Sequence, residues 1–240
     1  MNPDKICGLG EALHHWLSFQ ILCGREALLS ESYLNQPTGE YLLKAAGSSH
    51  LKTEHSHPVL NRLGKKGRPR QIDFCLLSKG KKHLTTAIEL KWITHSPLDK
   101  QRIIDDLLRL ECLLPERKGV HIYRYLIIAG RTTDLGEKFF NTSMNSQMGR
   151  IRFIDGILGA RRNETNRVIY EKLEFEQRGL FDKFEENYGS RIPKRFLTDL
   201  VYEQESKDIG IYCWRIRCSE NRQVVERVPT DTSAETADPS

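Results

Sequence analysis

Two short apolar segments, each interrupted by an acidic residue, constrain the fold of this chain most. The first covers residues 70–77 and carries Asp73, and the second covers residues 83–93 and carries Glu89. Both are rich in the aliphatic and aromatic residues that favour strands, and a polar stretch containing Gly80 lies between them. We therefore predict two strands paired as a β-hairpin.

Side chains of a strand alternate between its two faces, and this alternation places the charged residues. One face of the second strand carries Ile88, Leu90 and Trp92, and the opposite face carries Ala87, Glu89 and Lys91. Glu89 and Lys91 thus share a face about 6.5–7 Å apart along the strand. Asp73 lies between two apolar neighbours, so it faces away from them. We expect the hairpin to bring Asp73 beside Glu89 and Lys91 at one end of a sheet.

Periodicity in the rest of the chain predicts helices and strands in an α/β order. Helices are expected at residues 10–29, 30–47 with an interruption at Pro37, 97–114, 135–140 and 164–188, and strands at 51–57, 123–129 and 208–218. The strand 123–129 is apolar throughout, which is typical of a strand buried on both faces. The predicted fold class is α/β, a mixed β-sheet flanked by helices.

Length and composition indicate a globular domain. The chain has 240 residues, of which 38% are hydrophobic and 29% charged. We expect one domain over residues 1–227 and a disordered polar tail over residues 228–240. No apolar run approaches the roughly 20 residues that span a bilayer, and no secretory signal is recognisable, so no membrane partner is expected. The six cysteines form no Cys-x-x-Cys pair, and we interpret them as reduced thiols of a cytoplasmic protein.

Two carboxylates and a lysine on one sheet face suit phosphodiester hydrolysis. Asp73 and Glu89 offer the oxygen ligands that Mg²⁺ or Mn²⁺ prefers, and the metal would leave sites for water and a phosphate oxygen. A bound metal neutralises the phosphate and acidifies a water. Lys91 would orient that water and stabilise charge at phosphorus. These three residues are therefore the predicted catalytic core, with Asp73 and Glu89 as metal ligands.

The same residues resemble the signature of the PD-(D/E)XK, or restriction endonuclease-like, nucleases. Ile72-Asp73 is followed, after a gap of fifteen residues, by Glu89-Leu90-Lys91. The segment Asp105-Asp106-Leu107-Leu108-Arg109-Leu110 is similar to the helix that follows this motif, whereas Ile72 stands where the family name has proline. The resemblance implies a restriction-endonuclease-like core over about residues 31–130, which would leave residues 131–227 as a helical C-terminal elaboration.

The family often supplies one more acid from the helix before the first motif strand. Glu40 is the first choice for this additional catalytic acid, Glu31 the second, and Glu54 a third. The alternative to a catalytic site is an edge hairpin stabilised by a cross-strand ion pair between Asp73 and Lys91. Two further Glu-x-Lys triplets, at residues 116–118 and 205–207, lie in polar stretches and are not favoured.

A basic segment precedes and surrounds Asp73. Residues 60–82 contain eight Lys or Arg residues and one acid, although the net charge of the whole chain is only +5. The predicted nucleic-acid-binding residues in this segment are Lys65, Lys66, Arg68 and Arg70. Their sequence resembles an AT-hook, but we interpret it as a basic loop that contacts phosphates.

Other patterns are interpreted as structural. His50, His55 and His57 lack a matching second pair of ligands and fit a polar loop better than a metal site. Trp214, followed by Arg215 and Arg217, could touch nucleic acid, but core packing of the tryptophan explains the pattern better.

The expected function is that of a Mg²⁺-dependent DNA endonuclease, of restriction, defence or DNA-processing type. The alternatives are a non-cleaving nucleic-acid-binding module and the nuclease subunit of a larger complex. The expected partner is DNA. Because the chain offers only one predicted catalytic core, a duplex-cutting form would be a homodimer, and residues 151–218 are the expected dimer surface.

Overall fold

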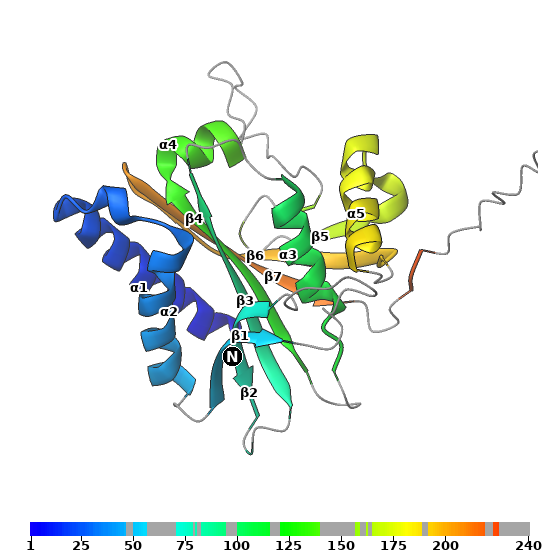
Figure 1. Cartoon of the computed structure of the whole chain (residues 1–240), viewed down its shortest axis with the longest axis horizontal. Coiled ribbons are helices and arrows are strands. Elements are labelled where there is room, and N and C mark those ends of the chain that lie inside the picture. Colours follow the sequence, from blue (N-terminus) through cyan, green and yellow to red (C-terminus); the bar gives the residue numbers. More distant parts are fainter. Residues whose placement is uncertain are drawn as a thin grey trace, which may run out of the picture.

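The computed structural model is organised around one twisted β-sheet with helices on both sides (Figure 1). It describes residues 1–46, 50–56, 71–78, 80, 83–94, 100–115, 121–139, 157–158, 162, 165–188, 192–218 and 223–225. All structural statements below refer to these residues. The tail 228–240 and residues 57–70, which include the first half of the basic segment, lie outside them, and the expected domain limits stay a prediction.

Seven strands form the sheet in the order β1-β2-β3-β4-β7-β6-β5. Their bounds are β1 Leu51–Ser56, β2 Gln71–Leu77, β3 Leu84–Ile93, β4 Tyr123–Arg131, β5 Thr165–Ile169, β6 Arg195–Glu205 and β7 Ile209–Cys218. Only the β3–β4 pairing is parallel, and the other pairings are antiparallel. The sheet is therefore mixed, as predicted, and β2 and β3 form the predicted antiparallel hairpin.

Helices cover the sheet on both faces (Figure 1). Helix α3, Lys100–Cys112, connects β3 to β4, because two parallel neighbours need a crossover between them. It packs with α5, Phe175–Tyr188, on one face, where the larger apolar cluster lies. Helices α1, Pro3–Leu22, and α2, Glu31–Ala46, cover the other face.

Helix α2 is continuous, so the predicted interruption at Pro37 is wrong. Proline removes only its own backbone donor and disturbs the preceding turn. Leu34 and Leu42, on either side of Pro37, are buried against the sheet, and Thr38 is fully buried. Because tertiary packing supplies most of the stability of a helix, this buried face compensates for the proline.

The C-terminal half is not the predicted helical elaboration. The expected helix 164–188 divides into β5, a 3₁₀ turn at Tyr170–Lys172, and α5, and the sequence prediction missed β6 altogether. The sequence pattern of residues 164–188 was interpreted as one helix, whereas pairing with β6 fixes residues 165–169 as an edge strand. Residues 165–218 therefore supply three strands of the same sheet. The prediction of core packing for Trp214, which is fully buried in β7, is confirmed.

Three smaller expectations concern the cysteines, membrane-spanning helices and the segment after β4. The six cysteines are free, and three of them are buried. No helix in the described ranges has the length and apolar character needed to cross a membrane. Two short helical turns, α4 at Thr132–Asp134 and the π-helical Leu135–Phe139, follow β4 where a helix was expected at 135–140.

Candidate functional site

Asp73 lies where the pairing of β2 with β3 ends. The last registered pair at this end is Phe74 with Ile88. Beyond this pair, a side chain takes the place of a backbone acceptor. Oδ2 of Asp73 accepts a hydrogen bond from the backbone N–H of Leu90 at 2.7 Å. The half-buried carboxylate is thereby held against β3 at a fixed position.

The hydrogen bond from Leu90 holds the carboxyl group of Asp73 beside Glu89, close enough for the charge of Asp73 to raise the pKa of Glu89. Glu89 is only 1% exposed, and burial raises its pKa well above the ordinary value, with the nearby acids adding to the rise. Burial also raises the pKa of Asp73, against the opposing effect of the hydrogen bond from Leu90. Two adjacent acids in a poorly solvated place hold protons more tightly than isolated ones do.

The faces of β3 are divided as the alternation predicts. Ile88 and Leu90 belong to the apolar cluster beneath α1 and α2, whereas Ala87 belongs to the cluster beneath α3. Glu89 and Lys91 share the face of Ala87 and therefore meet α3. The strand places both charged groups under a helix rather than in open solvent.

Helix α3 supplies two charged groups that close over the strand residues. Arg109 Nη2 lies 3.0 Å from Glu89 Oε1 and also contacts the carboxylate of Asp106, one turn earlier in the helix. Asp106 and Arg109 are 2% and 4% exposed, so both charges are held almost without water. Burial lowers the pKa of Arg109, but Glu89 and Asp106 outweigh that effect and raise it.

Lys91 is held between two acids from different helices. Its Nζ lies 2.6 Å from Asp106 Oδ2 and 3.2 Å from Glu31 Oε2. Burial lowers the pKa of Lys91, but the negative charges of Asp106 and Glu31 dominate and raise it, so the lysine stays an ammonium ion. The name acidic cluster is used below for Asp73, Glu89, Asp106 and Glu31 with their partners Lys91 and Arg109.

Glu31, not Glu40, is the additional acid that reaches the acidic cluster. Glu40 is exposed and accepts a hydrogen bond from Gln36 Nε2, one turn away in the same helix. Glu31 stands at the first residue of α2, where the helix begins next to Lys91. Helical spacing alone could not distinguish the two, because the choice depends on how α2 crosses the sheet.

Glu54, the third candidate, lies on the edge strand β1. It falls opposite Asp73, between the registered pairs Thr53–Phe74 and His55–Ile72, and its backbone has a φ of 48°. A non-glycine residue with positive φ is strained. Its side chain is exposed.

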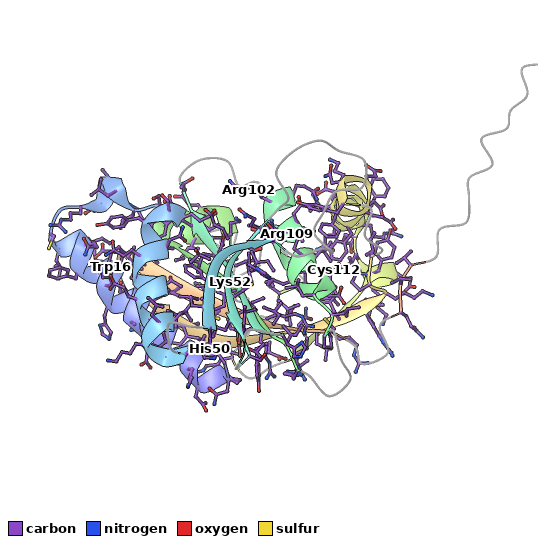
Figure 2. The ribbon with its side chains drawn as sticks, turned by 60° about the horizontal axis from the view of Figure 1, so that its bottom comes forward. Trp16, His50, Lys52, Arg102, Arg109 and Cys112 are labelled. Carbon is purple, nitrogen blue, oxygen red and sulfur yellow. The ribbon has the colours of Figure 1, made fainter. Side chains whose placement is uncertain are left out.

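The acidic cluster opens to solvent at its Glu31 side. The side chain of Glu31 is 33% exposed, and that of Arg102, which approaches it at 3.9 Å, is 58% exposed. Figure 2 shows Arg102 near the outer end of α3 and Arg109 further along the same helix, beside the strands. A ligand from solvent would therefore meet Glu31, Arg102 and the half-buried Asp73 first.

The charges of the acidic cluster are unbalanced in favour of the acids. Four carboxyl groups face two cations, Lys91 and Arg109. Glu89 Oε1 and Asp106 Oδ2 are buried, and although each lies near a cation, neither receives a well-directed hydrogen bond. Buried carboxylate oxygens with spare acceptor capacity fit a divalent cation bound through oxygen. Within the described ranges, no three or more His, Cys, Asp or Glu side chains are already arranged around a metal position.

The alternative of an edge hairpin with an Asp73–Lys91 ion pair does not describe this structure. β1 lies outside β2, so the β2–β3 hairpin is internal to the sheet. The ion pairs of Lys91 run to Asp106 and Glu31 instead. A buried structural network of ion pairs remains the physical alternative to a catalytic role.

Sequence reasoning named the helix that carries Asp106 and Arg109 but gave neither residue a role. The available signal was their i, i+3 spacing of opposite charges on a helix whose positions 103, 104, 107, 108 and 110 are apolar. The predicted phosphate-binding residues Lys65, Lys66, Arg68 and Arg70, and also His57, lie outside the described residues. Their proposed roles stay predictions.

Comparisons of the chain with protein-family models, curated proteins and solved structures find no match. The restriction-endonuclease-like assignment therefore depends on the residues of the acidic cluster and on the order of the elements that carry them.

Proposed function

We propose that the protein is a metal-dependent nuclease that hydrolyses phosphodiester bonds of DNA at the acidic cluster. The observation that carries this proposal is that Asp73, Glu89 and the ammonium group of Lys91 lie together on the face of the sheet that helix α3 covers. Acids that are brought together at the cost of raised pKa values are typical of functional sites rather than of stabilising surface pairs.

Asp73 and Glu89 would hold the divalent cation, Mg²⁺ or Mn²⁺. Mg²⁺ commonly binds proteins through one or two carboxylates and completes its shell with water and substrate phosphate, so two ligands from the chain suffice. The bound ion would supply charge neutralisation and a more acidic water. The raised pKa values of both acids support this assignment, because a nearby cation would relieve the repulsion between them.

The other members of the cluster would position these ligands. Arg109 contacts Glu89 and so limits the orientations of that carboxylate. Asp106 holds Lys91 as an ammonium ion, ready to donate a hydrogen bond to a phosphate oxygen. In the reaction, water adds to phosphorus and one ester P–O bond breaks, which leaves a phosphate monoester and an alcohol.

The order of elements supports a restriction-endonuclease-like core. An antiparallel hairpin carries Asp73, Glu89 and Lys91, helix α3 follows, and β4 returns parallel to β3. This order of elements is compatible with the proposed core. The proposed setting is the cytoplasm, with DNA as partner, and the chain acts as a homodimer or within a larger complex.

One observation favours a second candidate, a nucleic-acid-binding module that does not cleave. Arg109 already neutralises Glu89, and Lys91 is paired with two acids, so the network is closed without a metal. A buried network of this kind fixes structure as well as chemistry. Only a measurement of cleavage separates these two candidates.

The test is incubation of the purified chain with supercoiled plasmid and with single-stranded DNA, with Mg²⁺, with Mn²⁺, and with EDTA. The proposal predicts nicked or linear product with either metal and none with EDTA. Binding without cleavage under all conditions would favour the second candidate. Cleavage in EDTA would overturn the metal-dependent mechanism.

A further inference from the structure

The end of the sheet away from the acidic cluster carries a second charged surface. Direct partners across antiparallel strands share a face, so the registers of β5, β6 and β7 define its rows. One row is Thr165, Asp199 and Arg215, and the next is Arg167, Leu197 and Arg217, with Ile169 and Arg195 following. Four arginines and one carboxylate thus share this part of the sheet, which is called the arginine face below.

The arginine face is the one that α5 does not cover. The alternate residues of the same strands, among them Val168, Phe196, Trp214 and Ile216, are buried in the apolar cluster beneath α3 and α5. Helix α1 contacts the other part of β6 and β7, as in the hydrogen bond from Cys7 Sγ to the backbone of Val201 (Figure 1). Arg167 and Arg195 are exposed, and the side chains of Arg215 and Arg217 are 25% and 35% exposed.

Asp199 fixes two of these arginines in place. Arg215 donates to Asp199 Oδ2 through Nε and Nη2, at 3.1 and 2.9 Å. Arg217 Nη2 donates to Asp199 Oδ1 at 2.9 Å and to Thr165 Oγ1 at 3.0 Å. Burial acts to raise the pKa of Asp199, but hydrogen bonds from Arg217, Thr165 and Arg215 lower it. One ionised carboxylate therefore orients two guanidinium groups. The three groups together keep a net positive charge.

The half-buried ring of Tyr123, from β4, borders the arginine face, whereas Tyr125 is fully buried beneath it. Tyr125 is the registered partner of Arg215, and Tyr123, two residues earlier, lies on the same face. The ring of exposed His121 contacts Tyr123 edge to face, with centroids 4.8 Å apart. Partial burial lowers the pKa of His121, and the positive charges of Arg124 and Arg215 lower it further, which indicates a positive field here.

We propose that the arginine face binds the phosphate backbone of a nucleic acid, at a place separate from the acidic cluster. Guanidinium groups recognise phosphate through paired hydrogen bonds, and Asp199 orients two of them before any ligand arrives. The exposed Arg167 and Arg195 extend the positive surface across the next strands. Sheet faces that combine positive charge with aromatic rings are a recurring means of holding nucleic-acid strands.

The arginine face and the acidic cluster lie on opposite faces and near opposite edges of the sheet. The acidic cluster faces α3 on β2 and β3, whereas the arginine face is formed by β5, β6 and β7. Binding at the arginine face does not require that the acidic cluster be catalytic. A protein that fails to cleave DNA could still bind it here, so the two proposals fail independently.

The test is fluorescence anisotropy with a short labelled DNA duplex over a series of salt concentrations, in EDTA to prevent cleavage. The variant is Arg167→Gln/Arg195→Gln, because neither arginine contacts Asp199 and the buried carboxylate keeps its partners. The matched control, Arg25→Gln/Lys207→Gln, removes the same charge from two exposed residues elsewhere. Arg167→Gln/Arg195→Gln should weaken binding by about fivefold per lost contact near physiological salt and flatten the salt dependence by about 0.9 per contact.

An equal loss of affinity in the control would reduce the effect to net charge and overturn the proposal, as would unchanged affinity and slope in Arg167→Gln/Arg195→Gln. Anionic phosphatidylserine vesicles serve as a second probe. Binding to vesicles but not to the duplex, lost in the same variant, would show that the partner is a membrane surface and not a nucleic acid. Circular dichroism of each variant confirms that it is folded before its affinity is compared.

Discussion

Asp73 is held beside Glu89 at the point where β2 and β3 stop pairing, and its charge raises the pKa of Glu89. The backbone of Leu90 fixes one of these acids, and Arg109 contacts the other. The pair is therefore placed by elements on both sides of it, the strand backbone and the covering helix.

Glu31→Gln should reduce cleavage, whereas the matched substitution Glu40→Gln should not. Glu31 contacts Lys91, and losing its charge leaves that lysine with Asp106 alone. Glu40 is exposed and accepts a hydrogen bond from Gln36 in the same helix. Initial rates on plasmid DNA measure both. Equal rates for the two variants would remove Glu31 from the site.

Arg109→Met should destabilise the protein by about 3 kcal/mol at neutral pH, because it leaves Glu89 buried without its cation. The exposed Arg102 on the same helix is the control, and Arg102→Met should cost at most about 1 kcal/mol. Urea unfolding measures both. Adding Glu89→Gln to Arg109→Met should restore part of the loss, and a double variant no more stable than Arg109→Met would contradict the assigned contact.

Glu89→Gln should weaken the dependence of stability on pH in the absence of metal. The folded-state pKa of Glu89 is raised above its ordinary value of 4.5, so its contribution to stability is present below that value. The contribution is lost as the pH rises through the folded-state pKa. The wild-type protein should therefore lose more stability than the variant between pH 4.5 and 7. The pKa of Asp73 is raised in the same direction, so the variant keeps part of the dependence of stability on pH. Parallel profiles in urea unfolding would show that Glu89 ionises normally.

The strand alternation and the hairpin were predictable because local pattern decides them. Ile88 and Leu90 flank Glu89 on the opposite face, and this alternation decided that Glu89 and Lys91 converge. The choice of Glu31 over Glu40 was not predictable, since both lie on one helix and only the packing of α2 distinguishes them. The roles of Asp106 and Arg109 depend in the same way on where α3 crosses β3.

The strands of the C-terminal half could not be predicted from local sequence pattern. Residues 165–169 form a strand of only five residues that lies shortly before the helical segment 175–188, and β6 alternates imperfectly because a register shift falls between Leu200 and Tyr202. Both segments are strands because each pairs with a neighbour distant in sequence. Long-range pairing of this kind leaves little trace in a local window.

Lys91→Met should abolish cleavage and also lower stability. Lys91 is 7% exposed and paired with Asp106, so its removal leaves a buried acid short of one cation. Asp106→Asn added to Lys91→Met should recover stability without recovering cleavage, with a coupling free energy on the order of 1–3 kcal/mol. Thermal unfolding and cleavage rates, measured together, separate the two effects. Recovery of cleavage in the double variant would show that the ammonium group has no part in the chemistry.

The most direct measurement of the central claim is the cleavage rate of Asp73→Asn in saturating Mg²⁺, compared with that of Asp208→Asn. Asp208 is an exposed carboxylate in the turn between β6 and β7, so its substitution controls for the loss of one charge. The proposed site predicts that Asp73→Asn binds the DNA duplex as the wild-type protein does but cleaves it at least a hundredfold more slowly, on the order of the loss of one charge-stabilising group. Asp208→Asn should cleave at the wild-type rate. Wild-type cleavage by a folded Asp73→Asn protein would contradict the account.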